Sequence, residues 1–507
     1  MQRNHRLRAH YRPHLRVLSD FQIERIYQAS LTCLERTGVN VLNAEARRLL
    51  VDAGAQADGV RVRVPRGLVQ DALIAAPSSF KLWRRPVGNA GGSEASAGLE
   101  ICAALLDCGE PDCVHFGPGL TCTYFLDPET GERRKARRGD PEAAAKVCDA
   151  LDNFDYVMGL GLIDDVAPNL APVYEFAEMV TGTAKPPISW AYTIDTLHDI
   201  YEIGALVAGG EKALQERPFF ALFATSQAPL QHTDERMGTA LWAAEHGIPV
   251  VYLGGGSAGA TAPITGAGSL VVSLASSLSG LAALQLKRPG APVCIGGVPS
   301  AMDLRTARPS YGSPEMSLYS AAFSELARYL GLPFMGTAGA SESKSMDIQA
   351  AIECTLQVLL SGLSSTTLVH DAGFLDCADI GSLEMLVVTD EIIAMARRVL
   401  RGIEVTDETL MLDLIDDVGP GGHFIATRET AARCREEIWV PTLMDRDPWE
   451  SWVAGGGETM LDRVQARVRS VLALHSSPPL PLGVEEKITA ILRAAEEREG
   501  VADEVRL

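Results

Sequence analysis

The sequence lacks several motifs that usually reveal an enzyme's chemistry. No HExxH zinc motif, no Walker-type phosphate loop and no CxxC pair occurs among its 507 residues. Each of these motifs supplies a particular ligand set or phosphate cradle, so their absence disfavours a zinc hydrolase and a P-loop nucleotidase. No metal site is predicted from the sequence.

Basic residues are also in short supply relative to acidic ones. Forty-five Lys and Arg face 65 Asp and Glu, which gives a formal net charge of −20. A surface of that sign repels phosphate backbones, so nucleic acid is not an expected partner. The shares of apolar residues, 47%, and charged residues, 22%, are typical of a folded soluble protein and exclude a disordered chain.

Ten cysteines are spread along the chain, and only four of them lie near one another in the sequence. Cys102, Cys108, Cys113 and Cys122 are too unevenly spaced to resemble a zinc site, so we expect free thiols. The basic N-terminal segment is not followed by an apolar signal-peptide core. We therefore expect a reducing compartment, the cytoplasm.

One long stretch has no acidic residue, from Ile248 to Met302, and residues 263–286 carry no charge at all. That length is sufficient to span a bilayer. However, the segment SLVVSLASSLSGLAALQ contains five serines and mostly small apolar side chains. We predict instead a helix over about 264–286 that is buried on most sides, by the core or in part by a second subunit.

The first 80 residues are predicted to be mainly helical. Ser19 is a candidate N-cap for a helix that ends near Gly38, and further helices are expected in NAEARRLLVDAGA and RGLVQDALIAAP. A glycine- and serine-rich connection follows at 81–98. We therefore predict an N-terminal helical region over residues 1–85.

Beyond this connection, short apolar runs alternate with longer segments of helical pattern. Such alternation implies a parallel sheet, and eight units over this length predict a (β/α)8 TIM barrel within residues 86–402. The segment 121–134 is expected to form a hairpin inside the first unit, and residues 403–507 a helical C-terminal extension. The eight predicted strands are 114–119, 156–163, 188–193, 220–226, 250–255, 293–298, 334–339 and 367–373.

A doubly wound nucleotide-binding fold is the competing prediction. Its support is the GxGxxG pattern of Gly254 to Gly259, directly after a predicted strand. That fold also needs an acidic residue about 20 positions later to hold a ribose hydroxyl. The next acidic residue is Asp303, far beyond that distance. A glycine-rich loop at the barrel mouth is the alternative interpretation.

In TIM barrels the functional residues follow the carboxyl ends of the strands. Trp190 and Tyr192 lie two residues apart and are candidates for two walls of an aromatic box around a quaternary ammonium. Outward packing under the helices is their alternative role. His370, followed by Asp371, ends the last strand, and it is a candidate for anchoring an anion or for catalysis, with a core histidine as the alternative. Arg305, after the sixth strand, is a candidate for binding a carboxylate or a neighbouring acid.

The order of motifs along residues 18–475 resembles the trimethylamine methyltransferase family, in particular its members without pyrrolysine that act on glycine betaine. The sequence departs from the family near 424–430, where FIATRET stands in place of further expected histidines. The matching segments are LSDFQIERIYQASLTCLERTGV (18–39), APSSF (76–80), LDPETGERR (126–134), TAPITGAGSLV (261–271), DLRTARPSYGSPE (303–315), ASESKSMDIQAAIE (340–353) and VGPGGHF (418–424).

The resemblance implies both the fold and the reaction. Family members are (β/α)8 barrels that move a methyl group from a methylated amine to the cobalt of a separate corrinoid protein. The reduced cobalt is the nucleophile, so no catalytic residue and no permanently bound cofactor is expected in this chain. Since the sequence contains only standard residues, a small quaternary amine such as a betaine is the expected substrate, bound by Trp190, Tyr192, His370 and Arg305.

Two other functions remain open at the level of sequence. An NAD-linked oxidoreductase is supported only by the glycine pattern at 254–259. A non-catalytic binding protein for quaternary amines would have the same aromatic box without methyl transfer. The expected partners are a corrinoid protein, a small quaternary amine and further copies of the chain in a homo-oligomer, with no nucleic acid and no membrane. Arg305 is open to either the substrate or the corrinoid partner.

Overall fold

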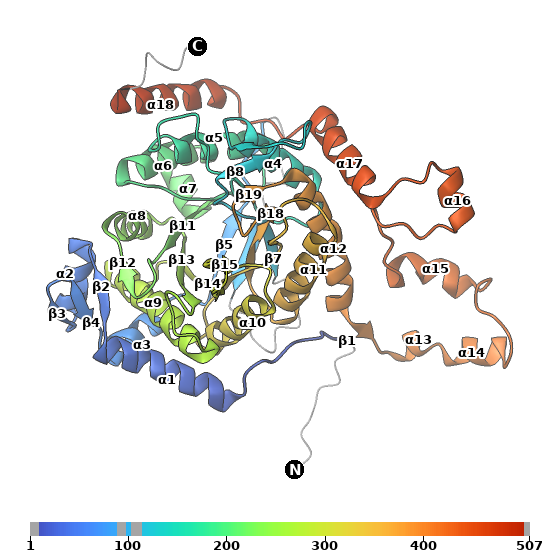
Figure 1. The fold of residues 1–507 in the computed structure, drawn as a ribbon, viewed down its shortest axis with the longest axis horizontal. Coiled ribbons are helices and arrows are strands. Elements are labelled where there is room, and N and C mark those ends of the chain that lie inside the picture. The colour runs from blue at the N-terminus through green and yellow to red at the C-terminus, as the bar shows by residue number, and fades with distance from the viewer. Residues whose placement is uncertain (1–9, 89–97, 103–113, 501–507) are drawn as a thin grey trace.

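The computed structural model describes residues 10–88, 98–102 and 114–500 and shows a ring of strands surrounded by helices (Figure 1). The side chains of Cys102, Cys108 and Cys113 lie outside the described part, so their predicted state is not addressed. Cys122, the fourth member of that group, is a buried free thiol.

Among the described residues, the central sheet contains seven strands that pair in parallel around a ring. The last strand along the chain, β17, pairs with the first, β7, which is the closing pattern of a barrel. In spatial order the strands are β10 (Ile188–Ser189), β11 (Ala221–Thr225), β13 (Val250–Ala258), β14 (Val293–Asp303), β16 (Phe334–Thr337), β17 (Leu368–Ala372) and β7 (His115–Pro118).

The prediction of a regular strand at 156–163 is wrong. The backbone of this segment nevertheless fills the eighth place in the ring, between β7 and β10. The Asp155 amide donates to the Phe116 carbonyl of β7, and the Val157 amide donates to the Pro186 carbonyl beside β10. The Ile188 amide then donates back to the Val157 carbonyl, which completes the ring. Beyond this bridge, Leu160 has a φ of 62°, so the chain cannot stay extended there.

A helix follows each of the eight strand positions on the outside, so the predicted (β/α)8 barrel is confirmed. Local sequence sets the helix starts: the Ser313 hydroxyl accepts from the Met316 amide, and Pro314 occupies the first turn of its helix. The helices are α4 (Asp140–Ala150), α5 (Ala171–Gly182), α6 (Ile194–Ala208) with the short α7 (Glu211–Glu216), α8 (Asp234–Glu245), α9 (Gly266–Lys287), α10 (Pro314–Tyr329), α11 (Ile348–Leu363) and α12 (Leu383–Arg401).

The uncharged helix α9 lies inside the protein, as predicted. It is long and apolar enough to cross a membrane, yet 83% of its most apolar window is buried within the fold. Its inner side packs on β13 and β14, and its outer side is covered by the N-terminal helices. Those helices are α1 (Asp20–Arg36), α2 (Ala44–Asp52) and α3 (Arg66–Ala75). A further covering by a second subunit stays a prediction.

Short strands connect this N-terminal layer to the barrel. His232, in β12, places its Nδ1 2.6 Å from the Tyr252 hydroxyl and its Nε2 2.8 Å from the Ser279 hydroxyl of α9. Complete burial lowers the pKa of His232 to about 4, so this ring is a neutral structural link. The strands of this layer are β2 (Val39–Val41), β3 (Gln56–Asp58), β4 (Arg61–Arg63) and β12 (Gln231–His232).

A two-stranded sheet of β5 (Ser79–Trp83) and β6 (Gly98–Cys102) closes the amino-terminal end of the barrel. Leu82 joins the apolar cluster inside the ring, and the Trp83 amide donates to the Pro218 carbonyl just before β11. Among the described residues, the barrel interior is therefore packed at this end.

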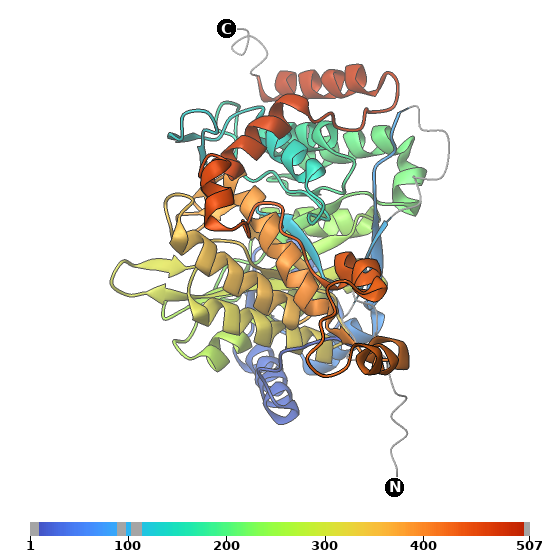
Figure 2. The same ribbon diagram turned by 90° about the vertical axis from the view of Figure 1, so that its right-hand side faces the viewer.

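Hairpins surround the opposite end of the barrel. The predicted hairpin at 121–134 is confirmed as β8 (Tyr124–Leu126) and β9 (Arg133–Lys135). It shares a small sheet with β18 (Phe374–Leu375) and β19 (Ile380–Gly381). A second hairpin joins the long β14 to β15 (Arg308–Ser310) and extends outwards in Figure 2.

The C-terminal extension divides into two parts. Helices α17 (Met460–Leu474) and α18 (Val484–Glu499) pack on α4, α5, α6 and α12. Between α12 and α17, a chain of short helices projects from the barrel (Figure 1). They are α13 (Asp407–Leu410), α14 (Leu412–Val418), α15 (Arg428–Glu437) and α16 (Trp449–Ala454), preceded by β20 (Ile403–Glu404), which pairs with β1 (His10–Tyr11). The division of the chain at residues 85 and 402 stays a prediction.

Gly280 of α9 provides a test of this packing. A Cβ there would lie 2.2 Å from the buried Tyr252 ring. Alanine normally stabilises a helix by about 1 kcal/mol relative to glycine. In Gly280→Ala we expect the clash to dominate and to lower the free energy of unfolding by roughly 1–3 kcal/mol in urea titrations.

Gly67 in α3 is the matched control, because a Cβ there meets nothing within 4 Å. Gly67→Ala is expected to leave the protein as stable as the wild type or slightly more so. Equal effects of the two substitutions would contradict the close approach of α9 to the strands.

Candidate functional site

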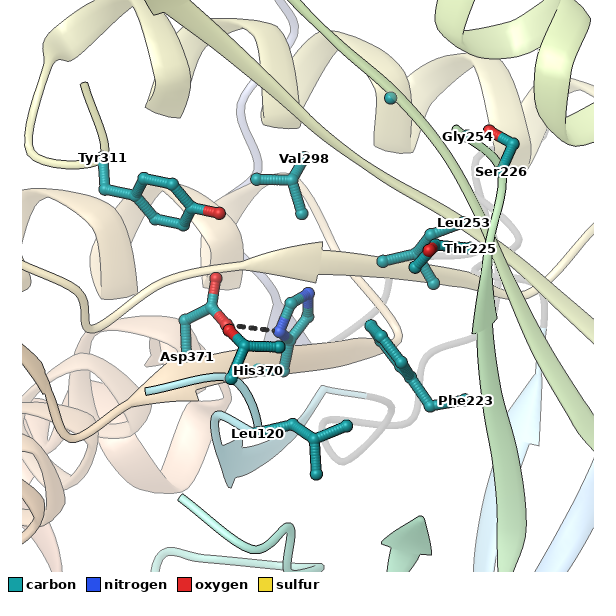
Figure 3. A pocket seen from close by; sticks show the side chains of 12 residues that line it. Leu120, Phe223, Thr225, Ser226, Leu253, Gly254, Val298, Tyr311, His370 and Asp371 are labelled. Carbon is teal, nitrogen blue, oxygen red and sulfur yellow. Dashed lines mark ion pairs between the residues drawn. The ribbon is translucent and has the colours of Figure 1, made fainter. Parts of the chain in front are cut away.

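A pocket of about 220 Å³ opens at the carboxyl ends of the barrel strands (Figure 3). Its walls come from β11, β13, β14 and β17 and from the loops after β7 and β15. Since β5 packs across the other end, this is the open side of the barrel in the described part of the chain. The lining residues are Leu120, Thr121, Phe223, Thr225, Ser226, Leu253, Gly254, Gly255, Val298, Tyr311, His370 and Asp371.

A buried ion pair of His370 and Asp371 forms one wall of the pocket. The two residues are 4% and 3% exposed, and His370 Nδ1 lies 2.5 Å from Asp371 Oδ1. The Thr337 hydroxyl donates to the other carboxylate oxygen of Asp371. Within the described part of the chain, His370 Nε2 has no hydrogen-bond partner. The pair therefore fixes the imidazole and leaves one buried nitrogen for a ligand.

Backbone geometry at the end of β17 creates this arrangement. Asp371 has a φ of 82°, which is unusual for a residue with a side chain. In a regular strand, adjacent side chains point to opposite faces. At this unusual φ, the imidazole of His370 and the carboxylate of Asp371 both face the pocket. Strained backbone of this kind often occurs at functional sites.

The other walls are mainly apolar. Leu120, Phe223, Leu253 and Val298 surround the pocket, and the Tyr311 ring lies on the same side as Asp371 (Figure 3). Burial raises the pKa of the Tyr311 hydroxyl above its ordinary value, so this group stays protonated. The buried Ser226 hydroxyl also lacks a partner among the described residues. Two polar atoms in apolar surroundings favour a small ligand with one polar end.

The glycines at 254–256 do not form a phosphate-binding loop. They lie within the continuous strand β13, which runs to Ala258, and not in a turn between a strand and a helix. A Cβ on Gly254 would lie 2.3 Å from the Ser273 carbonyl oxygen of α9. Gly254 thus allows close packing of the strand against α9. The position of all three glycines inside β13 corrects both the dinucleotide prediction and the prediction of a loop.

Trp190 and Tyr192 form an edge-to-face pair with ring centroids 4.4 Å apart and an interplanar angle of 79°. They lie beyond the short strand β10, not within it as predicted. Trp190 packs on the apolar cluster that includes Leu120 and Phe223 of the pocket, whereas Tyr192 is 42% exposed. Neither ring lines the cavity itself. Their role as walls of an aromatic box stays a prediction.

Arg305 lies in the hairpin between β14 and β15, away from the pocket lining. Its guanidinium group forms two hydrogen bonds with Asp303, at 2.8 and 3.1 Å, and its side chain is 89% exposed. Hydrogen bonding by Arg305 lowers the pKa of Asp303 to about 2. Of the four predicted site residues, only His370 contacts the pocket, and Arg305 meets a neighbouring acid.

Several residues that line the pocket were not predicted, although a pattern in the sequence points to some of them. Phe223 and Thr225 alternate on β11 and therefore share its inner face. Tyr311 and Thr337 had no such signal, because their contribution depends on how a hairpin and a neighbouring strand fold together. In the described part of the chain, no three His, Cys, Asp or Glu side chains come together to hold a metal ion.

Glu175 of α5 lies beneath Trp190 and is completely buried. One carboxyl oxygen accepts a hydrogen bond from the indole nitrogen of Trp190 at 2.8 Å, and the other accepts from the Ile163 amide at 3.2 Å. Burial raises the pKa of Glu175 to about 8. Glu175 therefore fixes the indole orientation while remaining largely protonated at neutral pH.

Comparisons with known proteins agree with the family resemblance of the sequence. The trimethylamine methyltransferase (MTTB) family matches residues 2–499. The trimethylamine methyltransferase MttB of Desulfitobacterium hafniense is 31% identical over 486 residues, which cover 96% of this chain and 95% of the relative. The glycine betaine methyltransferase of Desulfitobacterium hafniense is 28% identical over 485 residues, which cover 95% of this chain and 97% of the relative.

A solved structure supports the fold. The crystal structure of the hydroxylamine MtmB complex superposes with a TM-score of 0.50 at 10% sequence identity and covers 92% of this chain and 89% of its own. At this identity the likeness concerns the arrangement of the chain and does not assign any residue.

Glu175 allows a test by pH. Because its pKa is higher when folded than the ordinary value of 4.5, the folded protein retains a proton that the unfolded chain releases. The contribution of this group to stability is therefore complete below about pH 4.5 and is lost as the pH rises through 8. We expect wild type to lose on the order of 2 kcal/mol or more between pH 5 and 8 relative to Glu175→Gln.

The measurement is chemical denaturation of both proteins at each pH. Glu429→Gln, a change in α15 far from the barrel interior, serves as the control and should follow the wild type. If the difference between wild type and Glu175→Gln is constant across this range, the carboxyl group does not titrate as described.

Proposed function

Because the chain belongs to the trimethylamine methyltransferase family, we propose that it moves a methyl group from a small quaternary amine to the cobalt of a separate corrinoid protein. The enzyme class, a methyltransferase for methylated amines, follows from the family. The quaternary, betaine-like substrate and the role of each pocket residue are the parts of the proposal that go further.

The observation that carries the proposal is the small, mostly apolar pocket at the open end of the barrel. The corrinoid supplies a reduced cobalt that acts as the nucleophile and accepts the methyl group. A quaternary ammonium leaves as a neutral amine and needs no proton. The chain therefore has to hold one methyl group in line with the approaching partner and to exclude water, which positioning alone achieves.

The cationic end of the substrate is assigned to the aromatic and acidic side of the pocket. A quaternary ammonium donates no hydrogen bond, so ring faces and a carboxylate are its natural partners. Phe223 and Tyr311 line the cavity, and Trp190 packs on the same apolar cluster as Phe223. The Asp371 carboxylate also lies at the pocket wall, where it is paired with His370. We assign Trp190 and Tyr192 to the rim of this aromatic side.

The anionic end of a betaine is assigned to His370. Burying a carboxylate without a partner is costly, so a donor must face it. His370 Nε2 is a buried nitrogen without a partner in the described residues, and Asp371 holds the opposite nitrogen. In its protonated form the imidazole donates to Asp371 from one side and to the substrate carboxylate from the other.

A quaternary amine is favoured over trimethylamine for two reasons. The sequence contains only standard residues, whereas the family members that use trimethylamine carry pyrrolysine. A relative that matches along nearly its whole length acts on glycine betaine. The NAD-linked alternative has lost its only support, because Gly254 to Gly256 lie inside β13.

A corrinoid protein is the proposed partner, and the cytoplasm is the proposed location. The partner must approach the open end of the barrel, where the hairpin of β14 and β15 extends outwards (Figure 2). Arg305 stands at the turn of that hairpin with its side chain exposed. We therefore assign Arg305 to the partner rather than to the substrate.

Methyl transfer to a reduced corrinoid protein, with glycine betaine as donor, tests the function and the role of His370. In His370→Asn, the amide can still donate to Asp371 but is too short to reach a ligand. We expect the KM for glycine betaine to rise about tenfold to a hundredfold, as for a lost hydrogen bond to a charged group. The KM for tetramethylammonium, which has no tail, should change less than threefold.

Binding of quaternary amines without methyl transfer from any of them would favour the non-catalytic alternative. An equal loss for both donors would contradict the assignment of His370 to the carboxylate tail. Calorimetric titration of the amine without the corrinoid protein separates these two failures.

Arg305→Ala is expected to act on the partner. Charges at the rim of an interface change association rates modestly, so the KM for the corrinoid protein should rise a few-fold and depend less on salt. The KM for glycine betaine should stay at the wild-type value. A rise confined to the betaine KM would restore Arg305 as a substrate anchor.

A further inference from the structure

Tyr311 directly follows the hairpin of β14 and β15, and side chains from the next barrel unit bind both polar groups of its backbone. The Tyr311 amide donates to the Glu342 carboxylate, which also accepts from the Gly312 amide at 3.0 Å. The Tyr311 carbonyl accepts from the side-chain amide of Gln357 in α11 at 3.0 Å. Because the backbone is held on both sides of the residue, the direction of its side chain is fixed as well.

The two side chains that hold Tyr311 are themselves fixed by hydrogen bonds. Gln357 is buried, and its amide group makes three further hydrogen bonds to the backbone of the loop after β16. The Glu342 amide donates to the Glu353 carboxylate of α11 at 2.8 Å. A network in which each member has its partners is rigid. Two of the segments that carry the family resemblance, 303–315 and 340–353, thus meet beside the pocket.

The Tyr311 hydroxyl points into the cavity, on the side of His370 and Asp371 (Figure 3). Within the described part of the chain this hydroxyl makes no hydrogen bond. Both oxygens of the Asp371 carboxylate are already bonded, one to His370 and the other to Thr337. Burial, and after it the charge of Asp371, raises the pKa of Tyr311, so the hydroxyl keeps its proton. A hydroxyl in apolar surroundings costs free energy unless a ligand accepts its hydrogen bond.

His370 Nε2 is a second polar atom on this wall without a partner among the described residues. His370 belongs to β17, whereas Tyr311 follows β15, so the two atoms face the cavity from different segments. In the protonated imidazole Nε2 is a donor, and its charge offsets that of the bonded Asp371. A carboxylate can accept from two donors at once, whereas a trimethylammonium group has no lone pair and accepts from none. Two donors on one wall therefore fit the anionic end of a ligand.

We propose that the Tyr311 hydroxyl and His370 Nε2 form a two-donor clamp for the carboxylate tail of the quaternary amine, with Glu342 and Gln357 as the residues that position Tyr311. The inference rests on the proposed function and adds a further binding residue for its substrate. With the tail held by two bonds, the trimethylammonium end takes one orientation toward the approaching corrinoid. The clamp also favours a carboxylate over an uncharged tail, because hydrogen bonds to an ionised acceptor are stronger.

Tyr311→Phe tests the clamp, because it removes the hydroxyl and keeps the ring. We expect the dissociation constant for glycine betaine, from calorimetric titration of the chain alone, to rise about tenfold, as for a lost hydrogen bond to a charged group. Tetramethylammonium, which has no tail, should bind within about threefold of the wild-type affinity, since it makes no bond to the hydroxyl. Tyr201→Phe is the matched control: it removes a hydroxyl that Gln215 bonds outside the barrel, so both affinities should stay at the wild-type value.

A double variant tests whether both donors bind the same group. If they share one carboxylate, the loss of either donor loosens the hold of the other. Tyr311→Phe combined with His370→Asn should then weaken glycine betaine binding by less than the product of the two single losses. A loss equal to that product would show that the two donors act on separate groups, which contradicts the clamp.

Variants of Glu342 test the positioning of Tyr311. Glu342→Leu removes the acceptor of the Tyr311 amide and should reproduce the loss for glycine betaine, whereas Glu342→Gln, which keeps an oxygen acceptor, should recover most of the affinity. In the Tyr311→Phe background, Glu342→Leu should add less than about a twofold loss, because residues that act through one another are not additive. A larger added loss, shared by tetramethylammonium, would show a general disturbance of the pocket and no positioning role.

The outcomes separate the clamp from the proposed function. A wild type that binds glycine betaine more tightly than tetramethylammonium, but does not methylate the corrinoid protein, supports the clamp and contradicts methyl transfer. Unchanged affinity of Tyr311→Phe for glycine betaine, or an equal loss for both ligands, would overturn the clamp at any level of activity. Circular dichroism of each variant verifies that a loss of affinity does not result from unfolding.

Discussion

The close contact between α9 and the barrel strands is the constraint on which the rest of the structure depends. Glycines on both sides remove the side chains that would separate them: Gly254 faces the Ser273 carbonyl, and Gly280 faces the Tyr252 ring. Since α9 is then buried by the strands inside and by α1, α2 and α3 outside, it needs no polar face. Its lack of charge, which resembles a membrane helix in sequence, is a consequence of this double covering.

The same contact positions the site. β13 and β14 remain paired well beyond the other strands, from Val250 with Val293 to Ala258 with Ala301. These two strands contribute Leu253 and Val298 to the pocket, and the extended end of β14 carries the hairpin with Arg305. Opposite them, the strained Asp371 is the last residue but one of β17, and it is joined there to His370. Rigid strands on one side and a fixed ion pair on the other define a cavity for a small ligand.

Sequence patterns predict the parts of this structure that repeat locally. Apolar runs and helix caps predict the barrel, the hairpin at 121–134 and the buried helix, because each of these patterns lies within a stretch of about 20 residues. The missing strand at 156–163 depends on Leu160 adopting a positive φ, and the pocket depends on Tyr311 and Thr337 meeting Asp371 across the fold. Such features arise from long-range packing, so they have no local signature. Trp190 lies between these two cases. Its position at the end of a strand can be predicted from the sequence, whereas its hydrogen bond to Glu175 cannot.

A reaction whose nucleophile arrives on another protein places unusual demands on a barrel. The chain needs few reactive groups, and the described pocket has one buried His–Asp pair in mostly apolar walls. It must, however, keep the mouth open to a protein partner, since a permanent lid would block the approach of the corrinoid.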